Sequence, residues 1–130
     1  MTNATAYART NDLGGAMSRE TEALAFGLCN VRLAKARSLQ ERLAALHKTH
    51  LLWSILVRDL GHATNRLPVS LRNELVALGV WAMGYSLAAM TNGASLQPLI
   101  DVNQNLAEGL RAGITITPAS TKRTLAPISA

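Results

Sequence analysis

A stripe of apolar and aromatic side chains at helical spacing constrains the fold of this chain more than any other feature. From residue 39 to residue 60 these side chains recur at alternating intervals of four and three, the period of an amphipathic α-helix. The members of the stripe are Leu39, Leu43, Leu46, His50, Trp53, Val57 and Leu60. The pattern predicts a helix over residues 39–60 that packs one face against other helices, and Gly61 is expected to end it.

A helix is also expected before this stripe. Ser18 stands where an N-cap residue belongs, and Glu20 and Glu22 follow in the first turn, where carboxylates interact favourably with the helix dipole. We expect this helix to end near Arg37. Its apolar face is predicted to carry side chains spaced by three and four residues, namely Leu24, Leu28, Val31 and Ala34.

Pro68 predicts the start of a more apolar helix, because proline disfavours helical geometry in the residue before it and fits a first helical turn. This helix has two stripes, one of Leu71, Leu75, Leu78, Ala82 and Tyr85, the other of Val76, Val80, Met83, Leu87 and Met90. The uncharged run over 75–91 is slightly short for a membrane span, which needs roughly 18 to 20 strongly apolar residues. We therefore predict a helix buried on two sides rather than a membrane span, ended by Gly93.

A last helix is predicted from Ser95, a candidate cap, to Gly113, with Pro98 in its first turn. Its stripe consists of Leu96, Leu99, Asn103, Leu106 and Leu110. The asparagine in this stripe has two interpretations, which the sequence leaves open. It is either buried, where it would hold the helices in one register, or it faces a binding partner.

Four helices joined by short connectors predict an all-α protein with an up-and-down helical bundle. The 130-residue length suits one domain. We expect an N-terminal arm over residues 1–17, the helical domain over 18–113 and a flexible tail over 114–130. Hydrophobic residues make up 48% of the chain and charged residues only 16%, so the bundle is expected to leave apolar surface uncovered.

Side chains suited to catalysis or metal binding are sparse. His47 and His50 are spaced to share a helix face, but no further ligand follows at a spacing that would complete a zinc site. No phosphate-binding glycine loop occurs, and Cys29 is the only cysteine. We therefore expect no enzyme activity, no metal and no cofactor. The lone cysteine and the absence of an apolar leader at the N-terminus favour a cytoplasmic location.

The net charge of +5 permits contact with an anionic partner. A loose basic zone consists of Arg32, Lys35, Arg37, Arg42 and Lys48. No aromatic side chains are interleaved with these cations, as stacking on single-stranded RNA would require. A solvated basic face is the simpler interpretation, and we do not expect nucleic acid to be the main partner.

Several short segments together resemble the flagellar biosynthesis regulator family FlaF, which occurs in alphaproteobacteria. No single segment is specific, but their order and spacing are. The segments are Tyr7 and residues 18–23, 52–53, 59–60, 65–68, 71–72, 78–79, 99–103 and 109–111. The resemblance implies a cytoplasmic, non-enzymatic protein needed for flagellin production and export. It also implies flagellin as the partner, bound by a chaperone or positive regulator, with FlbT as a companion regulator.

Flagellin ends are amphipathic and unfolded before assembly, as the resemblance implies, and a helical protein with spare apolar surface could bind such a segment in a groove. The predicted binding residues come from the second stripe of the third helix and from the last helix: Val80, Trp81, Met83, Leu87, Met90, Leu106 and Leu110. Two alternatives remain. One is an RNA-level regulator acting with FlbT on flagellin messenger RNA through the basic zone, and the other is a homo-oligomer that buries the apolar stripe.

Overall fold

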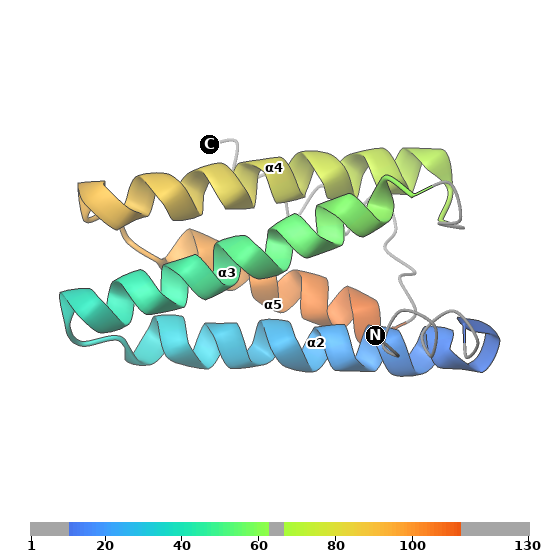
Figure 1. The fold of residues 1–130 in the computed structure, drawn as a ribbon, viewed down its shortest axis with the longest axis horizontal. Helices are drawn as coiled ribbons and strands as arrows, with labels where there is room; N and C mark the ends of the chain where they lie inside the picture. Colours follow the sequence, from blue (N-terminus) through green and yellow to red (C-terminus); the bar gives the residue numbers. More distant parts are fainter. Residues whose placement is uncertain (1–10, 63–66, 113–130) are drawn as a thin grey trace, which may run out of the picture.

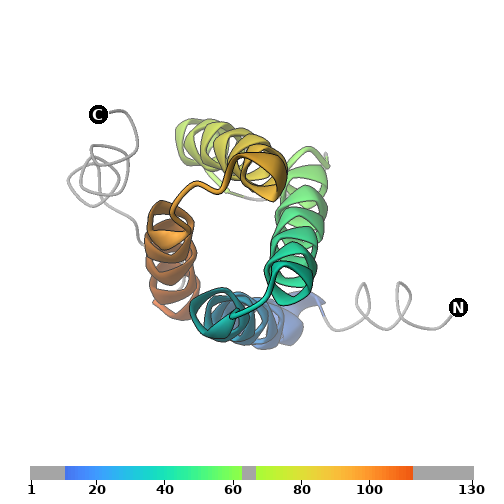
Figure 2. The ribbon, with the colours of Figure 1, turned by 90° about the vertical axis from the view of Figure 1, so that its left-hand side faces the viewer.

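The computed structural model describes residues 11–62 and 67–112, which form four α-helices and no strand within those ranges. The helices are α2 (Asn11–Lys35), α3 (Leu39–Leu60), α4 (Val69–Asn92) and α5 (Gln97–Arg111). Consecutive helices run in opposite directions (Figure 1), and viewed end-on they form the four sides of a square (Figure 2). The predicted all-α up-and-down bundle is confirmed. Residues 1–10 of the predicted arm and the predicted tail over 114–130 lie outside the described ranges.

Two helix pairs make most of the packing. Helix α3 lies along α4 and helix α2 lies along α5, whereas the contact between α2 and α3 is smaller and α4 barely touches α5. The centre of the core is Trp53 of α3, whose ring meets Phe26 of α2 edge-on, with the ring centroids 5.1 Å apart. Leucines from every helix surround this aromatic pair, so the first and last helices are held on the same core.

The helix ends agree with the predictions except at the start of α2. This helix begins at Asn11 rather than after Ser18, because residues 11–18 contain no proline and the glycines there weaken a helix without stopping it. Helix α3 has the predicted bounds, and a capping box fixes its start: the Ser38 hydroxyl accepts from the Glu41 N–H at 3.0 Å, while the Glu41 carboxylate accepts from the Ser38 N–H. Helix α4 ends at Gly93, whose φ of 66° suits glycine.

The face that α2 presents to the core differs from the predicted one. Leu24, Leu28 and Val31 are exposed, and the buried face is instead made of Ala23, Phe26, Cys29, Asn30 and Leu33. Helix α2 is rich in alanine and leucine on more than one side, so spacing alone could not select the buried side. The bulky Phe26 ring determines it, because this ring fills the space beside Trp53.

The fully buried residues of α4 lie on one side of the helix, so the prediction of burial on two sides is wrong. Its buried residues repeat at helical spacing and face α3, while Val80 and Leu87 are exposed. Within the described residues, α4 is the one helix with the length and composition of a membrane span, a test that core helices of soluble proteins also pass. The exposed side of α4 follows from its small contact with α5.

A chain of buried hydrogen bonds links α3, α5 and α2. The Trp53 indole N–H donates to the Asn103 Oδ1 at 2.8 Å, and the Asn103 Nδ2 donates to the Asn30 Oδ1 at 3.0 Å. Asn30 in turn donates from Nδ2 to the backbone carbonyl of Ile100 at 2.9 Å. Asn103 is fully buried, so the interpretation that it holds the helix register is the one the structure supports.

Arg42, a member of the predicted basic zone, has a structural partner. Its guanidinium Nη2 donates to the backbone carbonyls of Ala89 at 3.0 Å and Ala94 at 2.6 Å. These carbonyls belong to the end of α4 and the connector that follows it, so Arg42 of α3 fastens that end of the bundle. The Tyr85 hydroxyl donates to the Ser95 carbonyl on the same connector.

Candidate functional site

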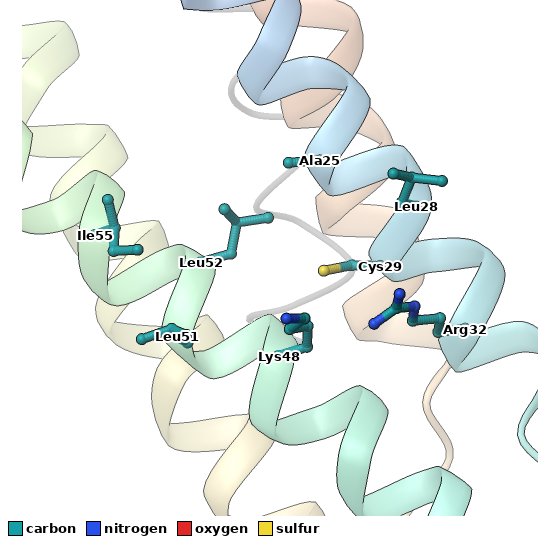
Figure 3. Close-up of a pocket in the computed structure, with 8 residues that line it drawn as sticks. All are labelled: Ala25, Leu28, Cys29, Arg32, Lys48, Leu51, Leu52 and Ile55. Carbon is teal, nitrogen blue, oxygen red and sulfur yellow. The ribbon is translucent and has the colours of Figure 1, made fainter. Parts of the chain in front are cut away.

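An open groove of about 260 Å³ runs between α2 and α3 on the surface of the bundle (Figure 3). Its walls come from two helices that run in opposite directions, and each helix contributes one face. The lining residues are Ala25, Leu28, Cys29 and Arg32 of α2, with Lys48, Leu51, Leu52 and Ile55 of α3. Most of this lining is apolar, although the groove is open to solvent.

The groove has a buried floor and an exposed apolar rim. Leu52 and Cys29 point toward one another between the helices (Figure 3), and Cys29 is buried. The rim residues Leu28, Leu51 and Ile55 are 62%, 45% and 43% exposed, respectively. Large apolar side chains that gather on one open surface are typical of a site that binds another protein.

Both basic side chains of the lining lie at the same end of the groove. Figure 3 shows Arg32 of α2 and Lys48 of α3 together at the end that leads to the connection between the two helices. Both belong to the predicted basic zone, and their charges flank the Cys29 thiol. The groove therefore combines an apolar middle with one cationic end.

Burial raises the pKa of the Cys29 thiol. A hydrogen bond with the Thr49 side chain and the charges of Arg32 and Lys48 act in the opposite direction but do not overcome burial. The thiol is therefore protonated at neutral pH, where it behaves as a small apolar side chain. Cys29 therefore forms part of the apolar floor of the groove.

Comparison with models of protein families matches residues 3–110 to the family described as flagellar protein FlaF. The match covers most of the 130 residues. This chain belongs to the FlaF family. The resemblance predicted from short segments is thereby confirmed, and the chain is a flagellar protein. Comparisons with curated proteins and with solved structures gave no match.

In this FlaF-family protein, the residues predicted to bind a partner do not form one surface. Val80 and Leu87 are exposed on α4, while Trp81, Met83 and Met90 are partly buried against the core. Leu106 and Leu110 lie on the side of α5 that faces the core, so they are placed in the interior rather than at a groove. We therefore define the α4 face as Val80, Trp81, Met83, Leu87 and Met90.

Sequence reasoning did not identify the α2–α3 groove in this FlaF-family protein. Leu51 and Ile55 fall outside the α3 stripe, and Leu28 was expected to face the core. In the sequence, the indication of a groove was the presence of large apolar residues outside the main stripe of a helix.

Among the described residues, no three His, Cys, Asp or Glu side chains are close enough together to hold a metal ion.

Two carboxylates lie beyond the other end of the groove in the FlaF fold. Glu22 precedes Ala25 by one turn on α2, and Asp59 follows Ile55 by one turn on α3. Burial raises the pKa of Glu22, the negative charge of Asp59 raises it further, and the positive charge of Arg19 partly offsets both. Because both carboxylates lie at this end of the α2–α3 pair, we call it the acidic end.

Glu22→Gln is expected to increase the free energy of unfolding at neutral pH. Because the pKa of Glu22 is raised in the folded state, folding disfavours the ionised carboxylate. This penalty is complete above the folded-state pKa, shrinks as the pH falls through it, and is absent below the ordinary value of 4.5. Urea unfolding at several pH values should therefore show a gain that declines on acidification.

Glu20→Gln is the matched control for this prediction, since it makes the same chemical change in the same turn of α2. Glu20 forms an exposed ion pair with Arg111, with 3.5 Å between Oε2 and Nε, and such pairs contribute only about 0–1 kcal/mol. This variant should be unchanged or slightly less stable at neutral pH. An equal gain in both variants would contradict the assignment of the penalty to Glu22.

Proposed function

We propose that this FlaF-family protein is a non-enzymatic, cytoplasmic factor of flagellum biogenesis that binds flagellin. In this role it acts as a chaperone and positive regulator of flagellin synthesis and export. The observation that supports the proposal is the open apolar groove between α2 and α3. Membership of the FlaF family supports the flagellar context of this proposal, and the groove supports a role in binding.

The groove has the form that suits an amphipathic helix. Such a helix places apolar side chains on one face at intervals of three and four residues, and it binds by setting that face between two helices of its partner. Here the exposed rim of Leu28, Leu51 and Ile55 would be covered by the bound segment. Removing apolar surface from water favours binding by roughly 25 cal/mol per Å² before the costs of ordering the segment.

Titration of purified flagellin into the full-length protein by calorimetry tests this proposal. We expect a complex that comigrates on a sizing column. Ile55→Glu should weaken it by about tenfold or more, as loss of an apolar anchor in an interface usually does. The side chain of Ile55 is 43% exposed, so the substitution should leave the fold intact, which circular dichroism checks.

Val80→Glu is the matched control, because it makes a similar change at an exposed apolar position of the α4 face. We expect it to bind flagellin with unchanged affinity. If Val80→Glu weakens binding and Ile55→Glu does not, flagellin binds the α4 face and the groove proposal is wrong. If wild-type protein gives neither heat nor comigration, the chaperone role is wrong.

The two alternatives have their own tests. Direct RNA binding through the basic zone would give an affinity for flagellin transcript that falls steeply with added salt. Arg42 already donates hydrogen bonds to Ala89 and Ala94, which supports a structural role for that member of the zone. For the homo-oligomer, light scattering reports whether copies of the chain associate. Addition of purified FlbT to the flagellin titration tests whether FlbT is a second partner.

A further inference from the structure

We propose that the α2–α3 groove binds its helix in one direction, parallel to α2, with a carboxylate of the bound segment beside Arg32 and Lys48. This inference rests on the proposed function and specifies the chemistry of the flagellin segment. The observation behind it is the order of charges along the two helices. An apolar middle separates a basic end from an acidic end.

The same order of side chains occurs on both walls. Along α2 the sequence Glu22, Ala25, Cys29 and Arg32 follows intervals of three and four residues, so these side chains share one helix face. Along α3 the corresponding face carries Lys48, Leu52, Ile55 and Asp59. The two helices are antiparallel (Figure 1), so the carboxylates of both walls lie at one end of the pair and the basic residues of both walls at the other.

The interactions of the end residues agree with this arrangement. Glu22 and Asp59 are close enough for the charge of Asp59 to act on the Glu22 carboxyl. At the other end, Arg32 and Lys48 both act on the Cys29 thiol between them. Arg19 offsets part of the negative charge at the acidic end, so the basic end carries the stronger charge of the two ends.

These charges favour one orientation of a bound helix. The N-terminus of a helix carries a partial positive charge and its C-terminus a partial negative charge. The N-terminus is therefore favoured beside Glu22 and Asp59, and the C-terminus beside Arg32. Since α2 itself runs from Glu22 to Arg32, the bound helix lies parallel to α2. A carboxylate in its last turn would add a direct ion pair with the basic end.

The distance between the two ends sets the length of the segment. Glu22 and Arg32 are separated by ten positions on one helix, which corresponds to about 15 Å at about 1.5 Å per residue. The fitting segment therefore has about three helical turns. It carries apolar side chains at intervals of three and four, and its acidic residue lies at the C-terminal end of that stripe.

The double variant Arg32→Glu and Lys48→Glu tests the basic end. We expect flagellin affinity to fall about tenfold or more at low salt, with a smaller difference as added salt screens the charges. The matched control is Lys35→Glu with Arg37→Glu, which changes the net charge equally at exposed positions outside the groove lining. Equal weakening by both double variants would overturn the proposal, because it would indicate general attraction between the two proteins.

The direction is tested by a nitroxide label on a cysteine introduced at Lys35, near the basic end, or at Arg58, near the acidic end. Isotope-labelled flagellin then reports which of its residues lie near each label. The Lys35 label should broaden signals at the C-terminal end of the bound segment, and the Arg58 label those at its N-terminal end. The reverse pattern would overturn the orientation.

The proposed function and this inference can fail separately. If flagellin binds and Ile55→Glu weakens the binding while Arg32→Glu with Lys48→Glu does not, the proposed function stands and this inference fails.

Discussion

Asn103→Leu is expected to lower the free energy of unfolding by about 2–5 kcal/mol, although leucine is the more apolar side chain. The substitution removes the acceptor of the Trp53 indole N–H and the donor to Asn30, both in the core. A buried polar group left without its hydrogen bond costs about 1–3 kcal/mol. Two such groups result, and urea unfolding followed by circular dichroism measures the loss.

A double-mutant cycle with Trp53→Phe separates the contribution of the hydrogen bond to the free energy of unfolding from that of side-chain packing. Trp53→Phe alone removes the indole N–H together with packing volume. In the Asn103→Leu background, that N–H has already lost its acceptor, so its removal should cost less than in the wild type. We expect a coupling of about 1–2 kcal/mol. Additive effects, or an Asn103→Leu protein as stable as the wild type, would show that the hydrogen bonds contribute little.

Gly79→Ala is expected to destabilise the bundle by up to about 2 kcal/mol, because overpacking usually costs about 1–3 kcal/mol and the better helix propensity of alanine returns about 1 kcal/mol. A Cβ at position 79 would lie 2.3 Å from Val57 Cγ2 and 3.1 Å from Trp53 Cε3. Neither atom belongs to a flexible chain end, so α3 and α4 would have to move apart. The cost of this movement should outweigh the gain in helix propensity.

Gly84→Ala provides the opposite result from the same substitution in the same helix. Gly84 is exposed on α4, and apart from its chain neighbours and the nearby backbone of its own helix, a Cβ there would have no atom within 4 Å. Only the helix propensity then changes, so we expect a gain of up to about 1 kcal/mol. Urea unfolding of the two variants tests both signs. If both stabilise the protein, the close approach of α3 and α4 does not limit its packing.

The sequence was most informative where one stripe dominates a helix. Helix α5 buries the predicted Leu99, Asn103, Leu106 and Leu110, and α3 has the predicted ends. In both helices the stripe is well defined by spacing, so few alternative faces compete with it. Helix boundaries were also predictable at Gly61, Pro68 and Gly93, because the effect of these residues on the backbone is local and does not depend on the rest of the fold.

The candidate site could not be derived in the same way, because it depends on which apolar faces the other helices leave uncovered. In α2 two faces are similar in hydrophobicity, and Phe26 decides between them only through its contact with Trp53 of another helix. In α4 the two stripes are clear, but the small contact with α5 leaves Val80 and Leu87 of the second stripe exposed. The groove needs Leu28 from one helix and Ile55 from another, and the spacing of residues within each helix does not predict that these two side chains line the same groove.

The packing of α2 on α5 has a consequence for synthesis of the protein. Helix α5 is synthesised after α2, α3 and α4, yet it packs along α2 and provides the asparagine that accepts a hydrogen bond from Trp53. A ribosome that has produced only α2, α3 and α4 therefore carries a chain whose central aromatic pair is still partly open to water. The native core can therefore close only after α5 has emerged from the ribosome.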